Sequence, residues 1–252
     1  MTDVEIKRDS LTLRGVLEIP EEKTNFDLAI LMHGFSGNCG RNNPGNMHYR
    51  LAKMLKEIGI ASVRFDFNGH GESDGNFCDM TVPSEIADGQ KILDYVRSLP
   101  GIKNIYLIGH SQGGVVAGML AGYYHEFISK LVLLAPAASL KDDALIGHTL
   151  NLRYDPLHIP DKQELRPGYN VGGFYLRTAQ TLPIYSVSAK YNGKVCLIHG
   201  TADDIVSPNV TIKYQQYYSQ SVVHWIAGAG HLFEGKYRNK MIDIVKDFIQ
   251  QK

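Results

Sequence analysis

The pentapeptide Gly109-His110-Ser111-Gln112-Gly113 is the most informative segment of this sequence. It follows the apolar run 104–108 (Asn-Ile-Tyr-Leu-Ile) and opens a segment of small and apolar residues, 114–121. The order is therefore strand, Gly-x-Ser-x-Gly, helix. Glycines two before and two after a serine permit a tight, strained turn without Cβ crowding, and such a turn lifts the hydroxyl clear of the sheet edge. The pattern predicts that Ser111 is an exposed nucleophile.

Short apolar runs on either side of this turn predict a sheet that is covered on both faces. Continuous apolarity over four or five residues is typical of buried parallel strands, and segments with helical spacing separate the runs. We therefore expect an α/β fold with a mostly parallel central sheet, flanked by helices and preceded by an antiparallel hairpin at 6–19. The expected strands are 28–32, 61–65, 105–108, 131–134, 195–198 and 221–226, and the expected helices are 47–58, 82–99, 112–122, 208–218 and 236–250.

Residues 136–188 break this alternation. The segment has no clear apolar strand, and Pro, Gly and Tyr cluster at 154–160 and 166–174. It is too long for a plain connection inside a compact domain. We expect a core of residues 1–135 and 189–252 and an inserted cap of residues 136–188, which would shape a substrate pocket over the carboxyl ends of the strands. A peripheral segment without ligand contact is the alternative.

Charge and composition narrow the class of ligand. Lys+Arg and Asp+Glu are equal at 26 each in 252 residues, and no basic run exceeds two residues. Such a balance argues against nucleic acid and anionic membranes as partners, so a small-molecule substrate is expected. The N-terminus lacks the apolar region of a signal peptide, and no apolar stretch reaches the length of a membrane span. A cytoplasmic location is expected, and the oligomeric state, including a homodimer, stays open.

The cysteines do not predict a disulfide framework or a zinc site. Cys39, Cys78 and Cys196 are odd in number and widely spaced. The glycine-rich stretches lack the spacing of a dinucleotide site and the lysine of a phosphate-binding loop. We therefore expect no cofactor and no metal.

A serine nucleophile needs a base to take its proton and an acid to orient that base. His231 follows Gly228-Ala-Gly230 after the strand 221–226 and precedes the last helix, where the chain order of serine, acid and histidine places the base. Asp203, in the turn after strand 195–198, is the preferred acid. The alternatives are its neighbour Asp204 and the pair 142–143, which follows strand 131–134.

The negative oxygen of a tetrahedral intermediate needs N–H donors. The backbone N–H of Gln112, directly after the serine at the start of a helix, is one candidate. The loop 33–37 (His-Gly-Phe-Ser-Gly) follows strand 28–32, and its glycines allow a close approach. We expect the N–H of Phe35 to be the second donor.

Longer segments add a resemblance to a known family. The motifs are 64–75 (Arg-Phe-Asp-Phe-Asn-Gly-His-Gly-Glu-Ser-Asp-Gly), 109–114, 134–138 (Leu-Ala-Pro-Ala-Ala) and 172–177 (Gly-Gly-Phe-Tyr-Leu-Arg). Together they resemble the bacterial cinnamoyl (feruloyl) esterases of the α/β-hydrolase superfamily. The resemblance implies the catalytic residues Ser111, Asp203 and His231 and the oxyanion donors Phe35 and Gln112.

The resemblance also implies a substrate class. Asp143 and Tyr175 match the cap residues that meet the ring hydroxyls of a hydroxycinnamate. The expected reaction is hydrolysis of feruloyl, caffeoyl or coumaroyl esters through an acyl-enzyme intermediate. Relatives carry a glutamine in the cap where this chain has Leu150, and residues 166–170 include one extra residue, so the preferred acyl group stays open. The alternatives are a short-chain acyl esterase, a monoacylglycerol lipase or a thioesterase, and, more remotely, a non-catalytic binding module.

Overall fold

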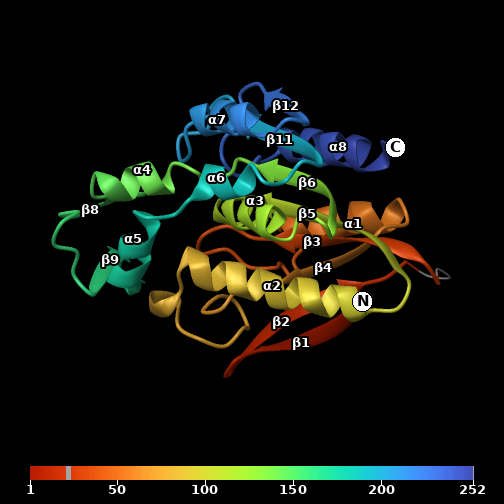
Figure 1. Cartoon of the computed structure of the whole chain (residues 1–252), viewed down its shortest axis with the longest axis horizontal. Coiled ribbons are helices and arrows are strands. Elements are labelled where there is room, and N and C mark those ends of the chain that lie inside the picture. Colours follow the sequence, from red (N-terminus) through yellow and green to blue (C-terminus); the bar gives the residue numbers. More distant parts are fainter. Residues whose placement is uncertain (21–23, 252) are drawn as a thin grey trace.

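One eight-stranded sheet organises the chain (Figure 1). The computed structural model describes residues 1–20 and 24–251. The sheet order is β1-β2-β4-β3-β5-β6-β11-β12; β1–β2 and β2–β4 are antiparallel, and every later pair is parallel. This confirms the mostly parallel sheet and the N-terminal hairpin. The strands are β1 (Thr2–Arg8), β2 (Leu11–Glu18), β3 (Phe26–Met32), β4 (Ala61–Phe65), β5 (Ile102–His110), β6 (Ile128–Leu134), β11 (Lys194–Gly200) and β12 (Ser221–Ile226).

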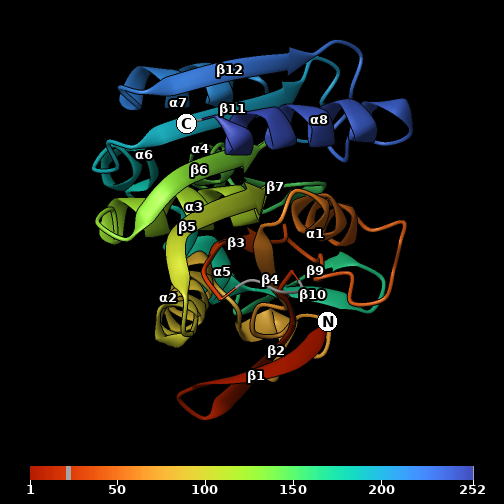
Figure 2. The ribbon, with the colours of Figure 1, turned by 90° about the vertical axis from the view of Figure 1, so that its right-hand side faces the viewer.

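Helices cover both faces of the sheet (Figures 1 and 2). Residues of α1 and α8 pack in one hydrophobic cluster, and residues of α2, α3 and α7 pack in the other. The five expected helices are confirmed with small shifts at their ends. They are α1 (Met47–Glu57), α2 (Val82–Ser98), α3 (Gln112–Tyr123), α7 (Asn209–Tyr217) and α8 (Lys236–Gln250), and a short 3-10 helix, η1, covers Phe77–Asp79.

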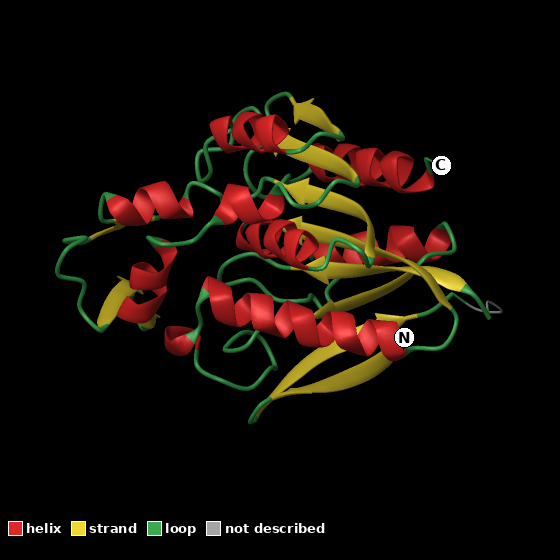
Figure 3. Cartoon of the chain, in the orientation of Figure 1, coloured by secondary structure: helices red, strands yellow, loops and turns green. Residues whose placement is uncertain are grey.

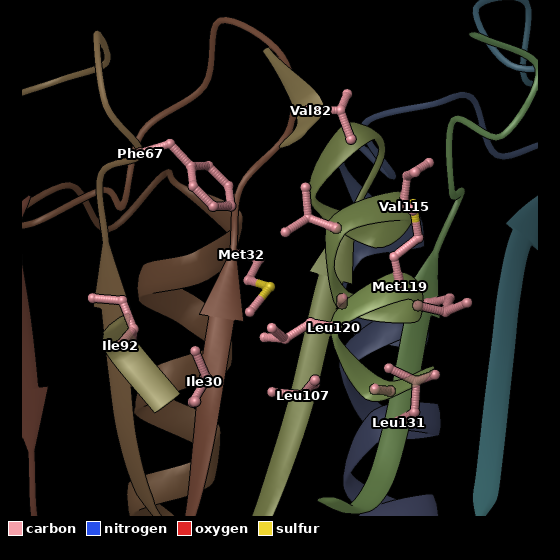
Figure 4. Close-up of a cluster of buried hydrophobic side chains, with 14 of the residues drawn as sticks. Ile30, Met32, Phe67, Val82, Ile92, Leu107, Val115, Met119, Leu120 and Leu131 are labelled. Atoms are coloured by element: carbon pink, nitrogen blue, oxygen red, sulfur yellow. The ribbon is translucent and has the colours of Figure 1, made fainter. Parts of the chain in front are cut away.

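The apolar runs of the central strands are continuous because these strands pack against helices on both faces of the sheet. In β3, Ile30 and Met32 join the cluster under α2 and α3, while Ala29 and Leu31 join the cluster under α1 and α8. Figure 4 shows Met32 and the neighbouring strand side chains against Leu120 of α3. Burying one such aliphatic side chain contributes about 1.5–3 kcal/mol. The central strands therefore form a rigid base for the loops at their carboxyl ends.

The segment 136–188 forms two separate two-stranded sheets, β7–β8 and β9–β10, rather than extending the main sheet. These strands and two helices lie together at one end of the molecule (Figure 3), whereas the last helix of the segment, α6, packs against α3. The cap boundaries at 136 and 188 stay a prediction. The elements are α4 (Leu140–Leu145), β7 (His148–Thr149), β8 (Leu152–Arg153), β9 (Lys162–Arg166), β10 (Tyr169–Gly172), α5 (Gly173–Ala179) and α6 (Ile184–Ser188).

Candidate active site

Ser111 lies in the turn between β5 and α3 with φ +56° and ψ −122°, a conformation that costs a non-glycine residue about 1–3 kcal/mol. The flanking positions have no room for a side chain, so they require glycine. A Cβ on Gly109 would lie 2.2 Å from the carbonyl oxygen of Gly113, and a Cβ on Gly113 would lie 2.3 Å from the carbonyl oxygen of His33. The strain is thus carried by the serine, and the glycines let strand, helix and loop 33–37 meet closely around it.

The structure brings Ser111, His231 and Asp203 together, as the sequence predicts. His231 Nε2 lies 2.9 Å from Ser111 Oγ, and His231 Nδ1 lies 2.8 Å from Asp203 Oδ2. A carboxylate only accepts hydrogen bonds, so Nδ1–H donates to Asp203 and the bare Nε2 accepts the serine O–H. The imidazole is therefore held in the tautomer that a general base needs.

The turn after β11 fixes Asp203 rather than its neighbour. The N–H groups of Ile205 and Val206 donate to Asp203 Oδ1 at 3.0 and 2.9 Å. Burial alone raises the pKa of this carboxyl, but hydrogen bonds from His199, His231 and the Val206 N–H outweigh burial and hold the pKa below its usual range. Asp204 is exposed beside it. The choice of Asp203 over Asp204 thus agrees with the geometry.

His199, at the end of β11, is a residue that the sequence analysis missed. It is fully buried, and its Nε2 lies 3.1 Å from both Asp203 Oδ2 and the Val206 carbonyl oxygen. Both neighbours are acceptors, so Nε2 carries the proton and Nδ1 accepts from the Thr211 hydroxyl at 2.7 Å. Two histidines, His199 and His231, therefore contact the same oxygen of Asp203, Oδ2.

Phe35 and Gln112, the two residues expected to supply oxyanion donors, both line the same cleft as Ser111. Gly34 packs so tightly that a Cβ on it would lie 2.8 Å from Ser111 Cβ, which places the N–H of Phe35 close to the serine. The N–H of Gln112 begins α3 next to it. Within the described part of the chain, neither N–H has a protein acceptor. The expected oxyanion pair is thus available, with the α3 dipole adding to the positive field.

The Gln112 side chain joins a buried network that reaches the insertion. Its Nε2 donates to Glu85 Oε2 at 2.8 Å, and the Tyr175 hydroxyl donates to its Oε1 at 2.7 Å. Glu85 is fully enclosed, and burial raises the pKa of its carboxyl well above the ordinary value. Tyr175 is 4% exposed. The hydroxyl that the resemblance assigns to substrate binding therefore also supports the residue that carries an oxyanion donor.

A cleft of about 610 Å³ opens at Ser111; we call it the acyl cleft. Its walls come from the serine turn, from the loop 33–37, from the insertion and from the turn after β11. Asp143 lies on its insertion side, 3.6 Å from His148 Nδ1. The side chain of Asp142 instead pairs with Lys213, at 3.8 Å. The lining residues used below are Phe35, Ser111, Gln112, Asp143, Leu150 and Tyr175.

Among the described residues, no group of three His, Cys, Asp or Glu side chains is arranged to hold a metal ion. In the same part of the chain no helix combines the length and apolarity needed to span a bilayer. Cys39 and Cys196 are buried, and burial raises the pKa of each thiol to about 12.

The fold and site define an α/β-hydrolase. The family model described as serine aminopeptidase, S33, matches residues 26–163, and the chain belongs to this family. Est1E from Butyrivibrio proteoclasticus, solved with ferulic acid bound, is 30% identical, with a TM-score of 0.92 over 98% of this chain and 97% of that one. This match confirms the resemblance drawn from the sequence. The matched family segment ends before Asp203 and His231, so the geometry alone places those two residues.

Curated relatives match over shorter stretches. Mouse monoglyceride lipase is 30% identical over 43% of this chain and 34% of its own length. Human mitochondrial palmitoyl-protein thioesterase ABHD10 is 27% identical over 64% of this chain and 53% of its own length. The chain thus spans about a third to a half of these relatives. They support an ester hydrolase without fixing its acyl group.

Proposed function

We propose that this protein is a serine carboxylic ester hydrolase that cleaves hydroxycinnamate esters through an acyl-enzyme. The observation that carries the proposal is the continuous hydrogen-bonded series from Asp203 through His231 to Ser111, which ends at a cleft beside two free N–H donors. This is the arrangement that acyl transfer by a serine hydroxyl requires.

In the first half of the reaction, Ser111 Oγ attacks the ester carbonyl carbon as its proton passes to His231 Nε2. Asp203 stabilises the resulting imidazolium, and the N–H groups of Phe35 and Gln112 bind the oxyanion. The imidazolium then protonates the departing alcohol oxygen, leaving an ester on Ser111. Water, deprotonated by the same nitrogen, attacks this ester and releases the acid and the free serine.

Two observations support a hydroxycinnamoyl acyl group. The acyl cleft has an aromatic wall, where the rings of Phe35 and Tyr175 lie 5.4 Å apart, and it has a carboxylate, Asp143, on the insertion side. An aromatic wall together with a carboxylate that can accept a hydrogen bond suits a planar acid with a ring hydroxyl. Est1E, solved with ferulic acid, shares this fold over nearly its whole length.

The second candidate is an esterase, lipase or thioesterase for aliphatic acyl groups. Leu150 lines the acyl cleft and is 42% exposed, which favours an apolar chain, and curated relatives include a lipase and a thioesterase. A binding module without catalysis is the weakest candidate, because all three reacting side chains are present and within hydrogen-bonding distance. The cytoplasmic location stays a prediction.

The test compares kcat/KM for methyl ferulate, methyl cinnamate, p-nitrophenyl butyrate, a monoacylglycerol and an acyl-CoA. We expect the highest value for methyl ferulate. The variant Ser111→Ala should lose all turnover and all labelling by a fluorophosphonate probe while its circular dichroism stays unchanged. A higher value for the monoacylglycerol or the acyl-CoA would favour the second candidate, and undiminished hydrolysis by Ser111→Ala would exclude the mechanism.

A further inference from the structure

A second, smaller cleft of about 250 Å³ meets Ser111 from the other side. His231 lines this cleft, whereas it does not line the acyl cleft. The histidine must give its proton to the departing alcohol oxygen, so the alcohol half of the ester has to lie on the side of the imidazole. The smaller cleft therefore receives the alcohol when the acyl group occupies the larger one, and we call it the alcohol cleft.

The alcohol cleft carries positive charge without negative charge among its described lining residues. Arg238 lines it, and no Asp or Glu is among its lining residues within the described part of the chain. The Arg238 guanidinium lies between two other lining residues, because Nη1 donates to the Gly45 carbonyl oxygen at 2.5 Å and Nη2 to the Leu232 carbonyl oxygen at 2.9 Å. Each of these nitrogens keeps a second N–H, so the group can still donate to a ligand.

In the part of the chain that the structure describes, the positive charge of Arg238 is not paired with a carboxylate. Among the described residues, no carboxylate lies within ion-pairing distance of Arg238. Burial lowers the pKa of the Arg238 guanidinium and the charge of Arg50 lowers it further, while the charge of Glu234 has a smaller, opposing effect. An anion in the cleft would relieve both effects.

Asn38 adds a second polar side chain to the lining of the alcohol cleft. Its Oδ1 is already used, since it accepts from the Gly40 N–H at 2.9 Å and from Asn46 Nδ2 at 3.3 Å. The hydrogen-bonding capacity that remains on the exposed Asn38 amide is therefore that of its N–H groups, which are donors. With the arginine, it makes the alcohol cleft a donor-rich, positively charged space with room for a small alcohol.

We propose that the alcohol released by this enzyme is a small hydroxy acid, whose carboxylate is bound by Arg238 in the alcohol cleft. This inference rests on the proposed esterase function and deepens it, because it assigns the leaving group rather than the acyl group. Arg238 is then a specificity residue: it contacts the alcohol and takes no part in bond making.

The test uses two matched esters, O-feruloyl-lactate and O-feruloyl-lactamide, which differ only by a carboxylate and its neutral amide. In the wild-type protein at low salt, kcat/KM for the lactate ester should exceed that for the lactamide about fivefold to tenfold, as expected for a partly exposed charged hydrogen bond. The ratio should fall as the salt concentration rises.

Variants separate the charge of Arg238 from its structural bonds. Arg238→Gln should bring the ratio close to one, and Arg238→Lys should restore most of it. Any damage to the loop that carries His231 would lower kcat/KM for the lactate and the lactamide esters alike and leave their ratio unchanged. Arg97→Gln, which removes an equal charge on α2 where Arg97 stacks on Phe127, should keep the wild-type ratio. A wild-type ratio near one, or an unchanged ratio in Arg238→Gln, would overturn the inference.

A second pair, O-butyryl-lactate and O-butyryl-lactamide, keeps the two proposals apart. If only the butyryl esters are cleaved and the lactate is preferred, the hydroxycinnamoyl assignment fails and the alcohol cleft stands. If the feruloyl esters are cleaved without preference for the lactate, the hydroxycinnamoyl assignment stands and the proposal for the alcohol cleft fails. Lack of turnover of all four esters would overturn both.

Discussion

Asp142 and Asp143 are neighbours on α4 with different surroundings, and they form a matched pair for testing substrate recognition. Asp143 lines the acyl cleft, while Asp142 is exposed and pairs with Lys213. A phenolic hydroxyl that donates to a carboxylate is worth about 1.5–3 kcal/mol. Asp143→Asn should therefore lower kcat/KM for methyl ferulate about tenfold, mainly through KM, and leave methyl cinnamate unchanged. Asp142→Asn is the control, and an equal loss for both esters in Asp143→Asn would contradict the assignment.

The Tyr175 hydroxyl leads to a different prediction, because it donates to Gln112 Oε1. Removing it in Tyr175→Phe leaves a buried amide oxygen without its donor and loosens Gln112, the residue whose N–H we propose as an oxyanion donor. We expect kcat to fall severalfold for methyl ferulate and methyl cinnamate alike, with KM little changed. A loss confined to methyl ferulate would show instead that Tyr175 reads the ring hydroxyl of the substrate.

The sequence predicted the three residues whose order along the chain is characteristic of a serine, acid and histidine triad. It missed His199, for which no such order exists. Ser111, Asp203 and His231 were found because each follows a different strand in the required sequence. His199 precedes a glycine at a strand end, as His33 does, and the two have the same local signature. Only the fold shows that His199 contacts Asp203 while His33 accepts from the Phe67 N–H.

Among the elements, the strand-turn-helix around Ser111 is the one that tolerates least change. A Cβ at Gly113 would lie 2.3 and 2.4 Å from the carbonyl oxygens of His33 and Met32, so Gly113→Ala must push α3 away from the oxyanion loop. We expect at least a hundredfold loss of kcat, in the range found when an oxyanion donor is lost, together with a lower Tm. Steady-state kinetics measures the loss of kcat, and thermal unfolding measures the change in Tm.

Gly230→Ala is the matched control. Gly230 also precedes a reacting residue, His231, but a Cβ there would meet only the Ala202 carbonyl oxygen, at 3.9 Å. Its kinetics and Tm should stay close to the wild-type values. If Gly113→Ala were as well tolerated as this variant, the tight contact between helix and loop would not be required for activity.

The sequence located the central strands well and the insertion strands poorly, for one physical reason. A strand such as β3 has apolar residues on both faces, so its run of residues is unambiguous. By contrast, β9 (Lys-Gln-Glu-Leu-Arg) alternates between exposed and half-buried residues, and β7 and β8 have two residues each. Contacts with the surrounding chain stabilise such short polar strands. Their own residues do not form the apolar pattern from which a strand is predicted.

For the molecule as a whole, four buried histidines set the expected dependence of stability on pH. Burial lowers the pKa of His33 and His70 to about 4 and that of His110 to about 3, and it lowers the pKa of His48 well below its ordinary value. In the unfolded chain each titrates near pH 6.5. Below that pH the unfolded state binds more protons, so stability is fully present above about pH 7 and is lost as the pH falls toward 4.

The free energy of unfolding should therefore drop by roughly 1 kcal/mol for each of these histidines between pH 7 and pH 5.5. Urea unfolding at several pH values measures the slope. His48→Gln should remove about a quarter of the loss, whereas His125→Gln, at an exposed position, should leave the slope unchanged. Glu85 acts in the opposite direction, because its raised pKa lets the folded state hold a proton that the unfolded state releases. The test is therefore the difference between the slopes of the variant and the wild type, and an unchanged slope in His48→Gln would mean that His48 ionises in the folded state.

The distance along the chain between the nucleophile and its base has a consequence for synthesis. Ser111 and His231 are 120 residues apart, and a ribosome adds about 5–20 residues per second. The serine turn thus leaves the ribosome roughly 6 to 24 seconds before the histidine does. During that interval the nascent chain carries the hydroxyl without the group that makes it reactive. The site that the two residues share is complete only after β11 and β12 have been synthesised and have joined the sheet.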